Sequence, residues 1–354
     1  MNLYEIYKAV LADKDKWNPT LRGDIDHDIE NIFKYPCSYN FVVELFWGDS
    51  DLRPLVFDIN KISNCVSQLR INHTISLYLL GIAIAEKIGF EKFQLPNWDS
   101  NPQRNFLHHW LAICLFHDIG YAIEDYYINE KLNDVSTLED LSRVMGLTYR
   151  LDLLQDSDLT RKYYAYRIKE CNKADHGIAG AMILYNSLMA ANEKKKDIER
   201  TAIIFSEKPI TGEHILKAIE LFSNSIAKHN MWFASQGQED IYNKYGLEKI
   251  IPKKDGTHLI SFEQDSMLYL LCLADTIEPL KIYCKQSAID VLQQVDIEIG
   301  ISENSEVTLT ADRKCSEILT KMKTLPEWLN CACEDICTDL RFCLSNNGKE
   351  EPKK

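Results

Sequence analysis

Apolar residues recur at helical spacing along most of this chain, and this periodicity is the feature that most constrains its fold. Residues 71–88 are so continuously apolar that they predict a buried helix. Glycine and proline, which interrupt helices, number only 14 and 10 among 354 residues. The sequence therefore predicts a mostly α protein, with further helices at residues 4–10, 106–119, 138–154, 177–190, 212–227 and 266–284.

One C-terminal stretch departs from this pattern. Residues 295–301 and 306–310 alternate apolar and polar side chains, as strands with one buried face do. The polar residues 302–305 between them are typical of a turn. We therefore predict a small β-hairpin, followed by helices up to a polar tail near Asn346.

The charge balance limits the classes of partner. Asp plus Glu number 53 and Lys plus Arg number 40, which gives a net charge of −13. A broad nucleic-acid surface needs many cations along a groove, so this balance argues against one. It is compatible with a small anionic substrate held by a few local cations.

The cellular location is predicted from three features. The N-terminus is charged and amphipathic, without a signal-peptide core. The longest largely apolar run, residues 75–85, is shorter than the ~20 residues that a membrane span needs. The 11 cysteines are scattered through the chain, which favours reduced thiols. We expect a cytoplasmic protein that does not enter a membrane.

Six polar side chains lie within or at the ends of the predicted apolar helices: His73, His117, Asp118, His176, His229 and Asp275. A carboxylate inside an apolar helix, such as Asp275, is costly unless it is paired or bound to a metal. Taken singly, a histidine on an apolar helix is more often a core residue with one hydrogen bond. Together, imidazole and carboxylate groups suit Mn, Fe, Co, Ni or Zn. A carboxylate such as Asp118 could bridge two ions that hold and activate a water between them.

The order of these residues resembles the H…HD…D signature of the HD-domain superfamily of metal-dependent phosphohydrolases. His73 matches the first histidine, His117-Asp118 the HD pair, and Asp275 the last aspartate. The flanking residues also agree with that family: Arg70 before the first histidine, Ile119 and Gly120 after the HD pair, and Leu-Ala before the last aspartate. The resemblance covers about residues 60–290.

The resemblance implies a helical bundle with two divalent transition metal ions as cofactors. The ligands that it implies for the first ion are His73, His117, Asp118 and Asp275. Asp118 would bridge to a second ion, because His176 and His229 fall where two-metal members carry additional ligands. The implied activity is that of a phosphohydrolase or phosphodiesterase, in which a metal-activated hydroxide attacks a nucleotide or another small phosphorylated metabolite.

The sequence also departs from individual subfamilies. His229 is followed by Asn230, where cyclic-dinucleotide phosphodiesterases carry a second histidine and then a Gly-Tyr-Pro element. Tyr121 stands where many HD phosphohydrolases have lysine. The proline-bearing extension of the deoxynucleotide triphosphohydrolases is missing. The resemblance therefore identifies the superfamily and assigns no subfamily.

Phosphate chemistry needs local cations, and four lie near the predicted ligands: Arg70, Lys173, Lys228 and Lys281. We assign catalytic roles to Arg70, Lys173 and Lys228 beside Asp118, and substrate-binding roles to Arg70, Tyr121 and Lys281. The alternatives are solvated lysines, a tyrosine that packs at a helix end, and an arginine that pairs with a carboxylate near the metal.

Several other residues have two readings each. Glu124, Asp125 and Asp175 could orient a ligand histidine or assist proton transfer, although solvated acids are more common. His109 is a further candidate proton donor, with a structural role as the alternative. Tyr163, Tyr164 and Tyr166 could line a substrate pocket, but a core role is more common.

A cysteine cluster lies near the C-terminus: Cys331, Cys333, Cys337 and Cys343. Four thiolates could bind zinc, but this spacing matches no established zinc pattern. The segment also has the pattern of an amphipathic helix, and we favour buried free thiols.

We predict that the chain is divided into an N-terminal helical extension (1–59), an HD-type metal-binding domain (60–290) and a C-terminal hairpin with helices (291–354).

Two functions compete with hydrolysis. A di-iron oxygenase of the myo-inositol oxygenase type would use the same six-ligand set, and a non-catalytic HD signalling or binding protein would retain it without turnover. The expected partner is a small phosphorylated substrate.

Overall fold

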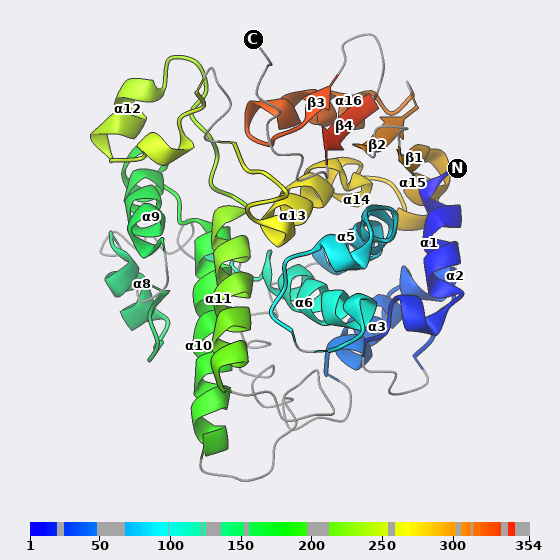
Figure 1. The fold of residues 1–354 in the computed structure, drawn as a ribbon, viewed down its shortest axis with the longest axis horizontal. Helices are drawn as coiled ribbons and strands as arrows, with labels where there is room; N and C mark the ends of the chain where they lie inside the picture. Colours follow the sequence, from blue (N-terminus) through cyan, green and yellow to red (C-terminus); the bar gives the residue numbers. More distant parts are fainter. Residues whose placement is uncertain are drawn as a thin grey trace, which may run out of the picture.

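The structure is a computed structural model (Figure 1), which describes residues 1–19, 25–47, 68–97, 99–121, 123–124, 136–151, 156–196, 212–253, 259–301, 306–312, 314–333 and 339–343. It confirms the predicted class, because the chain is mostly helical with a small antiparallel sheet near its C-terminus. None of the described helices is long and apolar enough to cross a bilayer.

Helix α5 (Gln68–Ile88) lies at the centre of the bundle and is buried along most of its length. It contacts α1 (Leu3–Leu11), α3 (Cys37–Trp47), α6 (Pro102–Phe116) and α13 (Ser266–Ile277). Because neighbours surround it, its sequence is apolar on nearly every side. Gly81 lets α6 approach, since a Cβ there would lie 2.2 Å from the indole of Trp110.

The remaining helices flank this centre. Helices α10 (His176–Lys196) and α11 (Gly212–Lys228) form a long pair beside α6 (Figure 1). The shorter helices are α2 (Ile29–Ile32), α8 (Leu138–Val144), α9 (Ser157–Cys171), α12 (Glu239–Lys244), α14 (Pro279–Ile282), α15 (Ala288–Gln294) and α16 (Ser316–Thr324).

Two predicted helices are shorter than their apolar patterns. The helix predicted at residues 138–154 ends at Val144, and Gly146 follows with φ +65°, which glycine adopts without strain. The helix predicted at residues 266–284 divides into α13 and α14, because Glu278 has extended backbone and Pro279 begins a new helix.

The predicted hairpin is present. Strands β1 (Ile297–Ile301) and β2 (Glu306–Ala311) pair antiparallel, with Ile297 opposite Ala311. Residues 302–305, where we predicted a turn, lie outside the described residues.

The cysteine-bearing segment after the hairpin is not the amphipathic helix we predicted. It forms β3 (Ala332–Cys333) and β4 (Asp339–Cys343), and the sheet order is β1-β2-β4-β3. Strand β4 covers the second edge of β2 and satisfies backbone groups that an isolated hairpin would leave unpaired. The proposed domain boundaries at residues 59/60 and 290/291 stay a prediction.

Candidate metal centre

Five helices bring the six candidate ligands together. His73 lies in α5, His117 and Asp118 follow α6, His176 begins α10, His229 follows α11, and Asp275 lies in α13. They form two groups, in each of which the three potential ligand atoms lie within 4.8 Å of one another: His73, His117 and Asp275, and Asp118, His176 and His229. The chain therefore contains buried groups of histidine and aspartate at metal-binding distances.

The first group has closely spaced ligand atoms. His73 Nε2 lies 3.1 Å from His117 Nε2 and 3.1 Å from Asp275 Oδ1. The distance from His117 Nε2 to Asp275 Oδ1 is 3.8 Å. Ligand atoms held about 2.0–2.2 Å from one ion are separated by about 3–4 Å, so the spacing fits a shared cation.

Asp118 lies between the two groups. Its Oδ2 is 3.6 Å from His73 Nε2, and its Oδ1 is 3.6 Å from His176 Nε2. Its Oδ1 is also 3.5 Å from His117 Nε2. The carboxylate therefore faces ligand atoms of both groups.

The three ligand atoms of the second group are buried and make no hydrogen bonds among the described residues. These atoms are Asp118 Oδ1, His176 Nε2 and His229 Nε2. A buried polar atom left unsatisfied costs about 1–3 kcal/mol. Three such atoms in one cluster are best explained by a ligand that binds all of them.

The other nitrogen of each histidine is held by an acceptor. His117 Nδ1 donates to the Cys114 carbonyl, and His229 Nδ1 donates to the Ile226 carbonyl, both at 2.6 Å. Each carbonyl lies three residues earlier, in the last turn of the helix that the histidine follows. A proton on Nδ1 leaves the lone pair on Nε2, which is the atom that faces the centre.

Carboxylates perform the same task for the other two histidines. His73 Nδ1 lies 2.6 Å from Glu278 Oε2, and His176 Nδ1 lies 3.1 Å from Glu124 Oε2. Both glutamates are buried. Glu124 is one of the candidates that the sequence offered for this role, whereas Glu278 is not. The available signal was an acid between the apolar helix α13 and Pro279, where it also accepts from the backbone N–H groups of Leu280 and Lys281.

The electrostatics of the cluster keep its carboxylates ionised. Burial alone would raise the pKa of Asp118, but the nearby His117 and Lys281 hold it well below its usual value. Burial would also raise the pKa of Asp275, but the charge of Lys281, the hydrogen bond with His73 and the charges of His73 and His117 together hold it well below its usual value. Burial lowers the pKa of His117 to about 4, so that imidazole stays neutral. Ionised carboxylates and neutral imidazoles are the forms that bind metals.

His73 has the opposite environment. Burial by itself lowers its pKa, but the charge of Glu278 and hydrogen bonds to Asp275 and Glu278 raise it to about 10. The surrounding carboxylates therefore favour a positive charge at this point of the cluster.

Arg70, Tyr121 and His176 form a stack beside Asp118. The Arg70 guanidinium lies 3.4 Å from the centroid of the Tyr121 ring, which lies 3.7 Å from the His176 ring at an interplanar angle of 13°. Arg70 Nη1 is also 3.4 Å from Asp118 Oδ2. The predicted arginine thus lies at the centre and pairs with a candidate ligand. Tyr121 packs against His176 and also lines the cavity described next.

A cavity of about 550 Å³ opens beside the candidate metal centre. Its lining includes His229 and Asp275, one from each ligand group, together with Tyr121 and Lys281. Lys281 Nζ lies 2.9 Å from Asp275 Oδ1. The cavity has the size of small-molecule sites, which are commonly 300–1,000 Å³.

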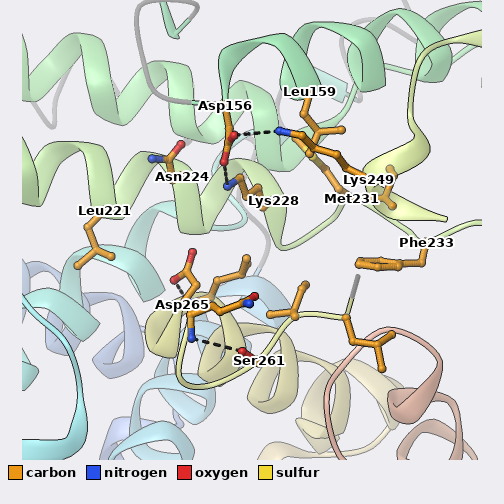
Figure 2. Close-up of a pocket in the computed structure, with 15 residues that line it drawn as sticks. Asp156, Leu159, Leu221, Asn224, Lys228, Met231, Phe233, Lys249, Ser261 and Asp265 are labelled. Carbon is orange, nitrogen blue, oxygen red and sulfur yellow. Dashed lines mark hydrogen bonds and ion pairs between the residues drawn. The ribbon is translucent and has the colours of Figure 1, made fainter. Parts of the chain in front are cut away.

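The other two predicted cations lie elsewhere. Lys173 pairs with Glu124, on the side of His176 that faces away from the ligand atoms. Lys228 lines a separate cavity of about 400 Å³, where its Nζ lies 2.7 Å from Asp156 Oδ2 (Figure 2). Lys249 contacts the other oxygen of that carboxylate at 3.5 Å. The structure therefore places Arg70 and Lys281 at the centre, but not Lys228.

The remaining candidates have structural environments. Asp175 accepts from the Ile178 backbone N–H and from Asn230 Nδ2, at 2.9 and 2.8 Å. His109 Nδ1 donates to the Asn105 carbonyl, and burial lowers the pKa of this histidine to about 4. Tyr163, Tyr164 and Tyr166 are buried in α9, as expected of core residues.

The cysteine cluster is described only in part. Cys331 and Cys333 are partly buried free thiols. Cys337 lies outside the described residues, as does Asp125, and Cys343 is described as part of β4 without its side chain.

Comparisons with models of known protein families, with curated proteins and with solved structures find no match for this chain.

Proposed function

We propose that this chain is a metal-dependent phosphohydrolase of the HD type that acts on a nucleotide or another small phosphorylated metabolite. One observation carries the proposal. Four histidines have Nδ1 held by a carbonyl or carboxylate, and their Nε2 atoms converge on two aspartates. Three of the six candidate ligands have a buried ligand atom that makes no hydrogen bond to the described residues. This arrangement supports the resemblance between the order of these residues and the HD signature.

The residues present suit two divalent transition metal ions. One ion would be held by His73, His117, Asp118 and Asp275, and the other by Asp118, His176 and His229. Such ions, when bound, polarise a phosphoryl oxygen and lower the pKa of water, which supplies a nucleophile at neutral pH. The histidines and aspartates of the chain supply the buried ligand set that this chemistry needs.

Other residues of the chain prepare the site for an anion. Lys281 faces the cavity beside Asp275, and the charges of Asp275 and Asp118 raise its pKa despite burial, so its ammonium stays protonated. The Lys281 side chain is 39% exposed, but its ion pair with Asp275 fixes the ammonium, and a cation that is already in place stabilises the charge of a phosphoryl group without reorganisation. Arg70 Nη1 contacts Asp118 Oδ2, whereas His176 Nε2 lies near the other oxygen, Oδ1. The Tyr121 ring lies between the Arg70 guanidinium and the His176 ring.

The experiment measures metal content and phosphate release together. The Mn-loaded protein is incubated under argon with nucleotides, cyclic nucleotides and sugar phosphates. Wild type is expected to bind about two metal ions per chain and to release phosphate or nucleoside from a member of the panel. Asp118→Ala should lose activity by at least about 10³-fold and lower the metal content, because both groups lose a shared ligand.

The control is Asp240→Ala, which removes an exposed aspartate of α12. It should behave like wild type. Full turnover by Asp118→Ala would refute the proposed site. Iron in the purified protein, oxygen uptake in air and silence across the phosphate panel would assign the centre to the di-iron oxygenase class instead.

A further inference from the structure

Trp232 is a large aromatic side chain that the fold holds rigidly in an exposed position. It is 58% exposed and lines the cavity beside the metal centre. Its indole Nε1 donates to Asn230 Oδ1 at 2.9 Å, and its backbone N–H donates to the Tyr163 hydroxyl at 2.9 Å. Its carbonyl accepts from the Tyr242 hydroxyl at 2.9 Å. The exposed part of the indole gains nothing from burial in the free protein, so its fixation by hydrogen bonds indicates a surface prepared for a ligand.

Asn230 connects this indole to the metal centre. While its Oδ1 accepts from Trp232, its Nδ2 donates to Asp175 Oδ2, a fully buried oxygen of the segment that precedes His176. Asn230 also directly follows the candidate ligand His229. The same amide therefore sets the position of the indole relative to both ligand-bearing segments.

The C-terminal region supplies another wall of the cavity. Thr320, Lys321 and Thr324 of α16 line it, and so does Trp328 just beyond that helix. The cavity thus contains two tryptophans, hydroxyl groups suited to polar ring edges or sugar hydroxyls, and Lys281 next to Asp275. Its aromatic and cationic groups come from different segments of the chain.

We propose that Trp232 is a stacking platform for a planar heteroaromatic ring, so that the substrate is a nucleotide whose base lies on the indole while its phosphate faces Lys281 and the metal centre. This inference rests on the proposed function and narrows its substrate class. Aromatic side chains stack on any base through its π face, whereas a sugar phosphate without a base offers the indole no such surface.

The test measures binding of nucleosides, because they contain no phosphoester and cannot be turned over by a phosphohydrolase. Adenosine, guanosine, cytidine and uridine are titrated calorimetrically into the metal-loaded protein. Ribose 5-phosphate, which is a phosphoester, is titrated into the metal-depleted protein, where it is not turned over. Trp232→Ala is expected to weaken binding of at least one nucleoside by roughly ten- to 100-fold and to change ribose 5-phosphate affinity by less than about twofold. Trp232→Phe should restore most of the nucleoside affinity, because it retains a stacking ring.

Two controls separate this proposal from folding and from the proposed function. Tyr39→Ala removes an exposed aromatic side chain of α3, which does not line the cavity, and should leave binding unchanged. Metal content should be the same in all four proteins. Nucleoside affinity that is absent in wild type, or equal in wild type and Trp232→Ala, overturns the stacking platform. Absence of bound metal would instead count against the proposed function, and nucleoside binding could still be measured.

Discussion

Glu278 has two roles that depend on the same buried carboxylate. Its Oε2 lies 2.6 Å from His73 Nδ1 and 3.0 Å from the Lys281 backbone nitrogen, while Oε1 accepts from the Leu280 nitrogen. A carboxylate on the far nitrogen of a ligand histidine fixes its tautomer and makes the ring more basic. Glu278 therefore adjusts the first ligand group without being a candidate ligand itself.

Glu278→Gln should weaken metal binding at this group by about ten- to 100-fold. Glutamine retains one acceptor oxygen for the helix N–H groups of Leu280 and Lys281, but it loses the second acceptor and the charge that strengthens His73. The measurement is a competitive titration of metal-depleted protein with a chelating indicator. Glu298→Gln, at an exposed position of β1, serves as the matched control. Equal affinities in the two variants would show that Glu278 acts only as a helix cap.

Individual residues show where sequence reasoning was sufficient. His73, His117 and Asp275 were identifiable because a polar group in an apolar helix needs a partner. Lys228 was a misleading candidate because adjacency to His229 in the sequence does not fix the direction in which the lysine side chain points. Its ammonium contacts Asp156 in another cavity. Glu278 was missed because its partner His73 is 205 residues away, and no local pattern reports such a pair.

At the scale of elements, the turn after α6 meets the start of α10 with almost no space between the two backbones. A Cβ on Gly120 would lie 1.9 Å from the His176 carbonyl oxygen and 2.6 Å from the Gly180 nitrogen. These are backbone atoms, which cannot rotate away as a side chain would. The glycine of the HDIG segment is therefore required for the close contact that places His176 opposite Asp118.

Gly120→Ala should force the turn and α10 apart. We expect a loss of about 1–3 kcal/mol in stability, the usual cost of overpacking, together with weaker metal binding by the second group. Thermal unfolding and metal content are the measurements. In Gly300→Ala the new Cβ would meet only the Thr308 hydroxyl, at 2.9 Å. A Gly120→Ala protein that unfolds and binds metal like Gly300→Ala would contradict the packing argument.

Element boundaries were harder to predict than element types. The division of α13 from α14 at Glu278-Pro279 depends on one proline within an apolar pattern, and that division brings Glu278 to His73. The strand β4 depends on pairing with β2, which is a tertiary interaction. A short segment such as residues 339–343 has a pattern that fits either structure until its neighbour is known.

At the scale of the whole molecule, the candidate metal centre joins five helices that are far apart in sequence. Its candidate ligands extend from residue 73 in α5 to residue 275 in α13, through the ends of α6 and α11 and the start of α10. In the absence of a bound cation, the buried polar atoms of Asp118, His176 and His229 oppose folding. Metal binding and folding should therefore be strongly linked.

Removal of metal should lower the thermal stability of the whole chain. A ligand that binds only the native state, present at about 100 times its Kd, contributes about 2.7 kcal/mol. For a chain of this length that corresponds to a shift of about 4 °C in Tm. Calorimetry of the metal-loaded protein with and without EDTA measures the shift. In Asp118→Ala the two scans should nearly coincide, since the ligand shared by both groups is gone. An equal shift in that variant would place the stabilising metal elsewhere in the molecule.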